Sequence, residues 1–570
     1  MTPSSPPRTP DATPLPDRRA FLSWCTAAGL GGTLFPGALW ARAQEAQEIT
    51  RAMVADAEKI AGIEFSDEER EMMLQGLSRN ASAYARLREQ PIPNGVMPAL
   101  HFDPQPPGTH PEVSPAPFRR SRPGRVEAPG AVEEVAFWPV AKLSELVRTR
   151  QLSSEELTRL YLDRLERHGP TLEAVITITR DRALRQARQA DREIALGQYR
   201  GPLHGIPWGA KDLLATADYP TTWGAMPYRT QQLDIDAAVV ERLDDAGAVL
   251  VAKLTLGALA QGDVWFGGRT RNPWNLEQGS SGSSAGPAAA TVAGLVGFGI
   301  GSETLGSIVS PATRCGATGL RPTYGRVSRY GAMALSWSMD KLGPLCRSVE
   351  DCALVLDAIH GADPRDPSTR TLPFPWDAER PLSELRVGFV PEAFEEGGFD
   401  ARALEVLRGL GVDPIEVTLP TEFPLSSLRI ILSAEAAAAF DELTRSGRDD
   451  ELTRQTGGSW PNTFRTARMI PAVEYIQANR VRTMVMGALD AAMEGIDVLI
   501  TPSFAQSVLL MTNLTGHPAV VVPHGFDDEG SPTSFSFVGK LWREEAALRL
   551  AKAFQDATDH HLQVPPLFAV

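Results

Sequence analysis

The sequence predicts an α/β fold, because short apolar segments alternate with helix-like segments along most of the chain. Uninterrupted apolar runs of this length are typical of strands that are buried on both faces. Four such runs are Val175–Thr179, Ala248–Ala252, Leu385–Val390 and Asp497–Ile500. With 570 residues, 43% of them hydrophobic, the chain can also bury one large core.

The first element is an export signal, predicted over residues 1–43. Arg18 and Arg19 form a twin-arginine pattern, and a glycine-rich apolar run follows from Trp24 to Trp40. Residues 41–43 (Ala-Arg-Ala) then offer a cleavage site. The run is too short and too rich in glycine for a membrane-spanning helix, so we expect a periplasmic or secreted protein without stable membrane insertion after cleavage. A disordered head followed by an anchor helix is the alternative.

An extension is predicted over residues 44–135. Its first half, residues 46–90, has apolar residues at helical spacing, and Ser66 begins a pattern that is typical of a helix start. Residues 91–130 are rich in proline, which indicates a strap or linker. Two helices are then expected between Val140 and Leu165, the second starting at Ser153.

Lys211 ends a short apolar run in the segment 201–212, GPLHGIPWGAKD. Such a run is typical of a buried strand that enters a loop. Burial would lower the pKa of this lysine toward the range in which the neutral amine is a usable base. The alternative is a surface lysine that pairs with its neighbour Asp212.

Residues 279–311, GSSGSSAGPAAATVAGLVGFGIGSETLGSIVSP, carry two Gly/Ser clusters around an apolar segment long enough for one buried helix. A flexible linker would not alternate with such a segment. Glycines allow close approach to a ligand, and hydroxyls can attack an acyl group or relay a proton. The pattern predicts two active-site loops that are held together by one helix.

These motifs together resemble the amidase signature family, whose members are serine hydrolases with a Ser-cisSer-Lys triad. Further matching motifs are TRNPWN at 270–275, TGLRPTYGR at 318–326, MDKLGP at 339–344, TP at 501–502 and LTGHPA at 514–519. The resemblance covers roughly residues 136–560 and implies an amidase domain over 136–570. It also implies the family fold, one large mixed β-sheet covered by helices on both faces.

Two Gly-Ser-Ser triplets compete for the bridging serine of the triad. Counting back from the second loop without a gap places it at Ser283. Ser280 would require a three-residue insertion, which would rotate the apolar face of the helix by most of a turn. We therefore prefer Ser283, and we expect Ser280 and Ser281 to be loop hydroxyls that bond to backbone.

The resemblance implies acyl transfer by a triad of Ser307, Ser283 and Lys211. Ser307 would attack the amide carbonyl, while Ser283 and neutral Lys211 would take the proton and return it to the leaving nitrogen. A cis peptide at Gly282–Ser283, or at its neighbour, is also implied. Backbone N–H groups would hold the oxyanion, at roughly 3 kcal/mol per donor. These groups belong to Thr304, Leu305, Gly306 and Ser307.

Three positions depart from the family pattern. Glu303 stands in place of the usual Asp, Leu305 in place of a Gly, and Val309 in place of an Arg. A leucine would be costly if that position needed a positive φ angle. These departures leave the triad intact, but they put the substrate class in doubt.

The remaining composition excludes other functions. A formal net charge of −14 without a basic stripe argues against a nucleic-acid partner. We expect no cofactor and no metal, since no further His or Cys completes a ligand set around Asp556 and His560. His204 and His517 are expected to be structural. Cys346 and Cys352 are either a disulfide or buried free thiols.

The predicted function is hydrolysis of the carboxamide C–N bond of a small molecule. The alternatives are the A subunit of an Asp/Glu-tRNA amidotransferase, against which the export signal argues, and a non-catalytic amidase-like binding protein. A homodimer is left open.

Overall fold

The computed structural model describes residues 49–88, 92–96, 100–122, 124–395, 401–505 and 507–570. The predicted export signal at 1–43 therefore lies outside the described residues. The main body is built on a mixed β-sheet of eleven strands in the order β1-β3-β2-β8-β10-β9-β14-β15-β13-β11-β12. The strands are β1 Val175–Ile178, β2 Pro207–Lys211, β3 Val249–Leu254, β8 Phe298–Glu303, β9 Thr318–Arg321, β10 Lys341–Cys346, β11 Val387–Phe389, β12 Ile415–Glu416, β13 Val498–Pro502, β14 Ala519–Phe526 and β15 Pro532–Gly539.

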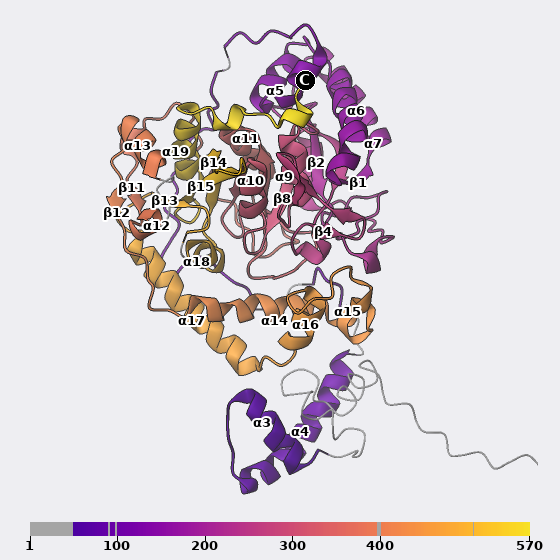
Figure 1. The fold of residues 1–570 in the computed structure, drawn as a ribbon, viewed down its shortest axis with the longest axis vertical. Coiled ribbons are helices and arrows are strands. Elements are labelled where there is room, and N and C mark those ends of the chain that lie inside the picture. Colours follow the sequence, from indigo (N-terminus) through magenta and orange to yellow (C-terminus); the bar gives the residue numbers. More distant parts are fainter. Residues whose placement is uncertain (1–48, 89–91, 97–99, 123, 396–400, 506) are drawn as a thin grey trace, which may run out of the picture.

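Helices cover both faces of this sheet, as Figure 1 shows and as predicted. Strand β3 illustrates why the predicted runs are apolar throughout: Val249 and Val251 belong to one hydrophobic cluster, and Leu250 between them belongs to the other. One cluster packs against α6 Ser154–Leu172, α7 Arg180–Ala195, α9 Ala285–Val292 and α10 Val309–Cys315. The other packs against α5 Val140–Arg148, α8 Ala238–Asp245, α11 Val349–Ile359 and α19 Glu544–Asp556.

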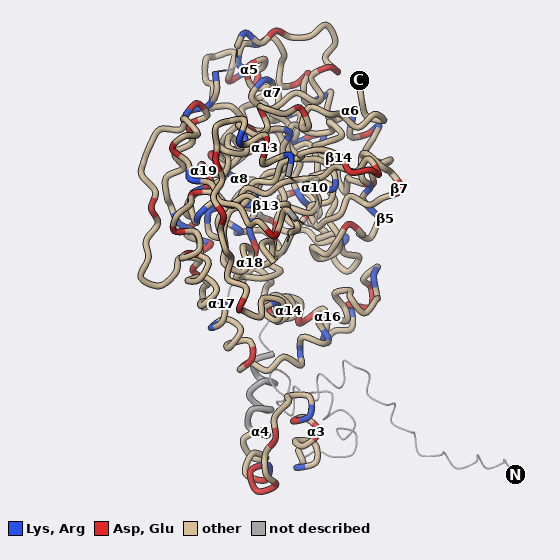
Figure 2. Tube along the Cα trace, turned by 60° about the vertical axis from the view of Figure 1, so that its left-hand side comes forward, with Lys and Arg blue, Asp and Glu red and all other residues tan. Residues whose placement is uncertain are grey.

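The predicted helix starts are confirmed by capping boxes. Ser153 begins α6, where its hydroxyl accepts from the backbone N–H of Glu156 while the Glu156 carboxylate accepts from the backbone N–H of Ser153. Ser66 and Glu69 make the same reciprocal pair before α4. The helical part of the extension is α3 Arg51–Ala61 and α4 Asp67–Arg88, which extend beyond the main body in Figures 1 and 2.

The apolar segment between the two Gly/Ser clusters differs from the prediction of one helix. Helix α9 ends at Val292, Gly294 adopts a positive φ of 66°, and the chain returns as strand β8. Glycines at 297, 299 and 301 in this return segment disfavour a helix and leave room for neighbouring backbone and side chains. The two clusters are therefore joined by a helix and a strand of the central sheet.

Residues 365–480 include helices at the left edge and along the lower edge of the main body in Figure 1. They are α12 Glu392–Glu395, α13 Ala401–Gly409, α14 Arg429–Ala439, α15 Asp441–Arg445 and α16 Trp460–Ala467, with α17 Ala472–Ala492 beginning there. Helix α18 Val508–Thr515 packs against α17. Two short hairpins, β4 Val264–Trp265 with β5 Gly268–Arg269 and β6 Arg271–Asn272 with β7 Asn275–Gly279, precede the first Gly/Ser cluster. Across the described residues, no helix is both long and apolar enough to traverse a bilayer.

Candidate active site

Lys211 is the last residue of β2 and is completely buried. Burial lowers the pKa of its ammonium well below the ordinary value, while the negative charges of Asp340 and Glu303 act in the opposite direction. The surface alternative is wrong, since Asp212 pairs instead with the buried Lys253, 2.9 Å away. The neighbouring carboxylate is therefore occupied elsewhere, and Lys211 is held by neutral oxygens.

Three serine hydroxyls surround the Lys211 amine. Its Nζ lies 2.8 Å from the Oγ of Ser283, 3.0 Å from that of Ser284 and 2.9 Å from that of Ser302. Ser284 also donates to the carbonyl of Ser302 and accepts from its N–H, which ties the start of α9 to the end of β8. The structure brings Lys211 and Ser283 together, as the sequence predicts. The contacts of Ser284 and Ser302 are not predicted, because sequence spacing does not reveal which serine side chains point toward the lysine.

The first Gly/Ser cluster approaches the second through backbone contacts. The Gly282–Ser283 peptide is cis, as the resemblance implies. A Cβ atom at Gly282 would lie 1.9 Å from the carbonyl oxygen of Gly262, so only glycine fits there. The N–H of Ser284 donates to the carbonyl of Ser307 over 3.1 Å. Ser280 lies outside the Lys211 contacts and donates instead to the backbone carbonyl of Ser281, as expected of a loop hydroxyl. The expectation is wrong for Ser281, whose hydroxyl bonds to the hydroxyl of Ser310 at 2.7 Å.

Glu303 holds the turn that carries Ser307. Its carboxylate accepts from the backbone N–H groups of Ile308 and Val309, and it pairs with the buried Arg321 at 2.8 Å. Burial alone would raise the pKa of Glu303, but Arg321 and the hydrogen bonds lower it to about 2. The longer acid in place of Asp therefore works as an anchor at the N-terminus of α10.

Leu305 does not carry the backbone cost that its position could have imposed. Among the described residues, the positive φ angles at this turn are limited to Gly306, at 84°. The Leu305 side chain packs, half-buried, against the main hydrophobic cluster. Within the described part of the chain, no backbone carbonyl accepts from the N–H groups of Thr304, Leu305, Gly306 or Ser307 in the turns and loops. Their role as an oxyanion hole stays a prediction.

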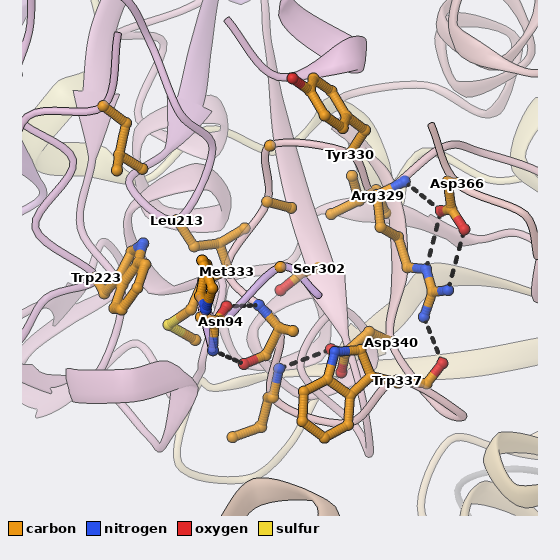
Figure 3. Close-up of a pocket in the computed structure, with 18 of the residues that line it drawn as sticks. Asn94, Leu213, Trp223, Ser302, Arg329, Tyr330, Met333, Trp337, Asp340 and Asp366 are labelled. Atoms are coloured by element: carbon orange, nitrogen blue, oxygen red, sulfur yellow. Dashed lines mark hydrogen bonds and ion pairs between the residues drawn. The ribbon is translucent and has the colours of Figure 1, made fainter. Parts of the chain in front are cut away.

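A cavity of about 450 Å³ lies beside this centre (Figure 3). Ser302 and Thr304 line one part of it, and Asp340 is held there by the Thr304 hydroxyl at 2.6 Å. The rest of the lining is mainly apolar. It includes Val96, Leu213, Trp223, Leu233, Ile235, Ala260, Met333, Leu335, Trp337 and Leu342.

His204 and His517 make hydrogen bonds within the protein, as expected of structural residues. His204 accepts from the backbone N–H of Arg200, and His517 bonds to Thr515, with burial lowering the pKa of His517 to about 3. Cys346 and Cys352 are buried free thiols, so the disulfide alternative does not apply in this structure. No cluster of His, Cys, Asp or Glu that could hold a metal occurs within the described ranges.

Comparison with known proteins agrees with this arrangement. The Amidase family model matches residues 156–548. The chain is 34% identical to the A subunit of the glutamyl-tRNA(Gln) amidotransferase of Carboxydothermus hydrogenoformans, over 76% of this chain and 100% of that protein. Its counterpart from Roseiflexus castenholzii is 36% identical, over 75% and 97%.

Among solved structures, the native peptide amidase from Stenotrophomonas maltophilia is similar, with a TM-score of 0.68 and 32% identity. The match covers 77% of this chain and 100% of that one. A family model that matches most of the chain, and relatives matched along nearly their whole length, agree with the buried lysine and its serines. The chain therefore belongs to the amidase family and is an enzyme that acts on amide C–N bonds.

Proposed function

We propose that this enzyme hydrolyses a carboxamide through a covalent acyl intermediate on Ser307. The observation that carries the proposal is the Lys211 amine, which has a lowered pKa and is buried among three hydroxyls, one of which belongs to Ser283. A buried lysine without a carboxylate partner loses its proton readily and is suited to act as a base near neutral pH.

In the proposed first step, Ser307 Oγ forms a bond to the amide carbon. Its proton passes to Ser283, while the Ser283 proton passes to Lys211. The carbonyl oxygen becomes an oxyanion next to the N–H groups of the turn 304–307. As the C–N bond breaks, the relay returns a proton to the leaving nitrogen. Water then attacks the acyl-enzyme by the same route and releases the acid.

The hydrogen bonds around Lys211 favour this direction of proton transfer. The Ser284 hydroxyl donates its hydrogen bond to the carbonyl of Ser302, so it can only accept from the Lys211 amine. A neutral amine has two N–H groups and one lone pair. With one N–H committed to Ser284, the lone pair is left for Ser283 or Ser302, and a proton arriving through Ser283 has an acceptor.

A fluorophosphonate probe tests the nucleophile. The wild-type protein should be labelled, and Ser307→Ala should not, because the probe bonds to an activated serine oxygen. Ser310→Ala removes a nearby serine in α10 and should be labelled like the wild type. Equal labelling of Ser307→Ala and wild type would disprove the assignment.

The second candidate function is that of an amidotransferase A subunit, favoured by the amidotransferase relatives that match along nearly their entire length. Amide transfer also begins by releasing the amide nitrogen, so the triad alone does not separate the two functions. The purified chain should hydrolyse simple amides by itself if it is a stand-alone amidase. Ammonia release that occurs only from glutamine, and only with added partner subunits and charged tRNA, would favour the transferase.

We also propose export through the twin-arginine route, supported by the pattern at Arg18 and Arg19. An exported enzyme would not meet charged tRNA, which favours the hydrolase. A fusion of residues 1–46 to a reporter that requires this route should be transported, and the Arg18→Lys/Arg19→Lys fusion should not. Unchanged transport of the double variant would contradict the proposal.

A further inference from the structure

The proline-rich strap of the extension forms a wall of the cavity of about 450 Å³ that lies beside the proposed catalytic residues. Pro93, Asn94, Gly95 and Val96 line it together with Ser302 and Thr304 (Figure 3). These four residues precede the part of the chain that the family model matches, residues 156–548. The cavity therefore has one wall that the family pattern does not describe.

Asn94 fastens this wall to the main body by its side chain. Its Oδ1 accepts from the N–H of Ala334 at 2.6 Å, and its Nδ2 donates to the carbonyl of Ala334 at 2.9 Å. The Nδ2 also lies 3.5 Å from the carbonyl of Ala439, at the end of α14. The amide group thus occupies both backbone polar atoms of one residue, 240 positions away, in the way that a neighbouring strand would.

The strap borders a second cavity as well. This cavity, of about 650 Å³, shares Trp337 with the first and is lined by strap residues from Leu100 to Pro107 together with residues of α14 and α17. Two successive parts of the strap therefore border adjoining spaces. This repeated arrangement shows that the strap contributes to the walls of both cavities.

Three charged groups in the first cavity, Asp340, Arg329 and Arg365, already have hydrogen-bond or ion-pair partners. Asp340 accepts from the Thr304 hydroxyl and from the N–H groups of Leu335 and Ser336. Arg329 pairs with Asp366. Arg365 pairs with Glu241 and Asp363. The cavity thus offers apolar surface, and a charged substrate group would gain no uncommitted partner among these residues.

We propose that Asn94 is a positioning residue for substrate, and that the wall it holds selects amides with a bulky, uncharged apolar group next to the scissile bond. The proposal rests on the proposed amide hydrolysis at Ser307. The cavity volume of about 450 Å³ falls in the range, about 300–1,000 Å³, of small-molecule sites. Asn94 does not touch the reacting atoms; it keeps Val96 and its neighbours against the apolar group.

Three amides test the proposal: acetamide, benzamide with a ring on the acyl side, and acetanilide with a ring on the amine side. The wild type should prefer at least one aryl amide. Asn94→Ala should raise KM for that substrate about tenfold, with kcat within about twofold and acetamide kinetics unchanged. Val96→Ser leaves the hydrogen bonds of the Asn94 side chain intact and should raise the same KM by a smaller factor.

Gln151→Ala is the matched control. Gln151 also clamps the strap through both atoms of its amide, to Val126 and Ala128, away from the cavity lining. It should leave the preference for aryl amides unchanged. No preference for either ring in the wild type, or equal KM changes for all three amides in Asn94→Ala, would overturn the proposal.

Binding separates this proposal from the proposed reaction. Calorimetry with the preferred aryl amide and Ser307→Ala needs no turnover, and adding Asn94→Ala should weaken that binding about tenfold. If the probe fails to label Ser307 but binding still depends on Asn94, the proposed reaction at Ser307 is wrong, while the proposed role of Asn94 in substrate binding is supported. If the probe labels Ser307 but binding does not depend on Asn94, the proposed role of Asn94 in substrate binding is wrong.

Discussion

The serine loops and the strap border the same cavity but are built in opposite ways. Residues 279–311 are contiguous, nearly all buried, and fixed by backbone contacts within the central sheet and its helices. Residues 93–96 lie on the outside and are fastened by one side chain to residues hundreds of positions away. The two serines of the proposed triad therefore come from one contiguous stretch, whereas Lys211 and the residues that shape the neighbouring cavity reach it from distant parts of the chain.

Among these tests, Lys211→Met is expected to have the largest effect on activity, because it removes the proposed base while nearly keeping the volume of the side chain. We expect kcat/KM for an amide to fall by about 10³-fold or more, with little change in KM. Only the neutral amine is active, so wild-type kcat/KM should fall as pH decreases through the lowered pKa of Lys211. The pH–rate profile of the variant should lack this step. An identical acid limb in both proteins would assign the base elsewhere.

Arg321→Met tests the buried ion pair between Arg321 and Glu303, the carboxylate that holds the turn carrying Ser307. It leaves the Glu303 carboxylate buried and unpaired, so the free energy of unfolding should fall by about 3–5 kcal/mol. Because the pKa of Glu303 in the folded protein is about 2, against an ordinary 4.5, the pair stabilises the protein above pH 4.5. That contribution should disappear as the pH falls from 4.5 toward 2. Urea unfolding at several pH values measures both effects.

Arg380→Ala is the control for that experiment. Arg380 pairs with Glu384 at 2.6 Å, and both side chains are more than 40% exposed. Exposed pairs contribute about 0–1 kcal/mol, so the control should change the unfolding free energy little. A similar loss in both variants would mean that burial does not distinguish the two pairs.

Ser283→Ala against Ser280→Ala tests the register of the first loop. Ser283 contacts the lysine, and its loss should lower kcat by about 10²–10³-fold. The Ser280 hydroxyl donates to a backbone carbonyl of its own loop, so its loss should lower kcat less than about threefold. Single-turnover kinetics would separate acylation from release. A reversed order of effects would move the bridging role to Ser280.

Leu305→Gly should have the smallest effect. Since Leu305 already adopts an ordinary φ angle, the glycine relieves no strain, and kcat/KM for acetamide should stay within about threefold. The unfolding free energy should fall by about 1–2.5 kcal/mol, because glycine has more conformational freedom in the unfolded chain and the half-buried leucine side chain no longer packs against the hydrophobic cluster. A rise in activity of more than about tenfold would show that the leucine obstructs the site.

The fold could be predicted because it leaves local marks in the sequence, whereas the proposed reacting residues are indicated by motifs that resemble those of the amidase signature family. Apolar runs such as Ala248–Ala252 reveal strands buried on two faces, and the spacing of the loops fixes Ser283 and Ser307 relative to each other. Strand β8 was not predicted, because its glycines weaken any periodicity and an apolar segment of that length also suits a helix. The strap contact could not be predicted either. Nothing in the sequence around Asn94 indicates that its amide reaches Ala334, since that contact exists only after the sheet has formed.

The three hydroxyls around Lys211 would have a kinetic consequence in the proposed mechanism. An ammonium has three tetrahedral N–H positions, and Ser283, Ser284 and Ser302 supply three partners at 2.8–3.0 Å. A neutral amine can use the same three partners with two N–H groups and one lone pair. The lysine can therefore gain and lose its charge without moving a heavy atom, so little reorganisation accompanies each proton transfer. The Lys211 side chain is already ordered before substrate binds. The entropy cost of aligning the proposed base is therefore part of folding and does not add to the barrier of each turnover.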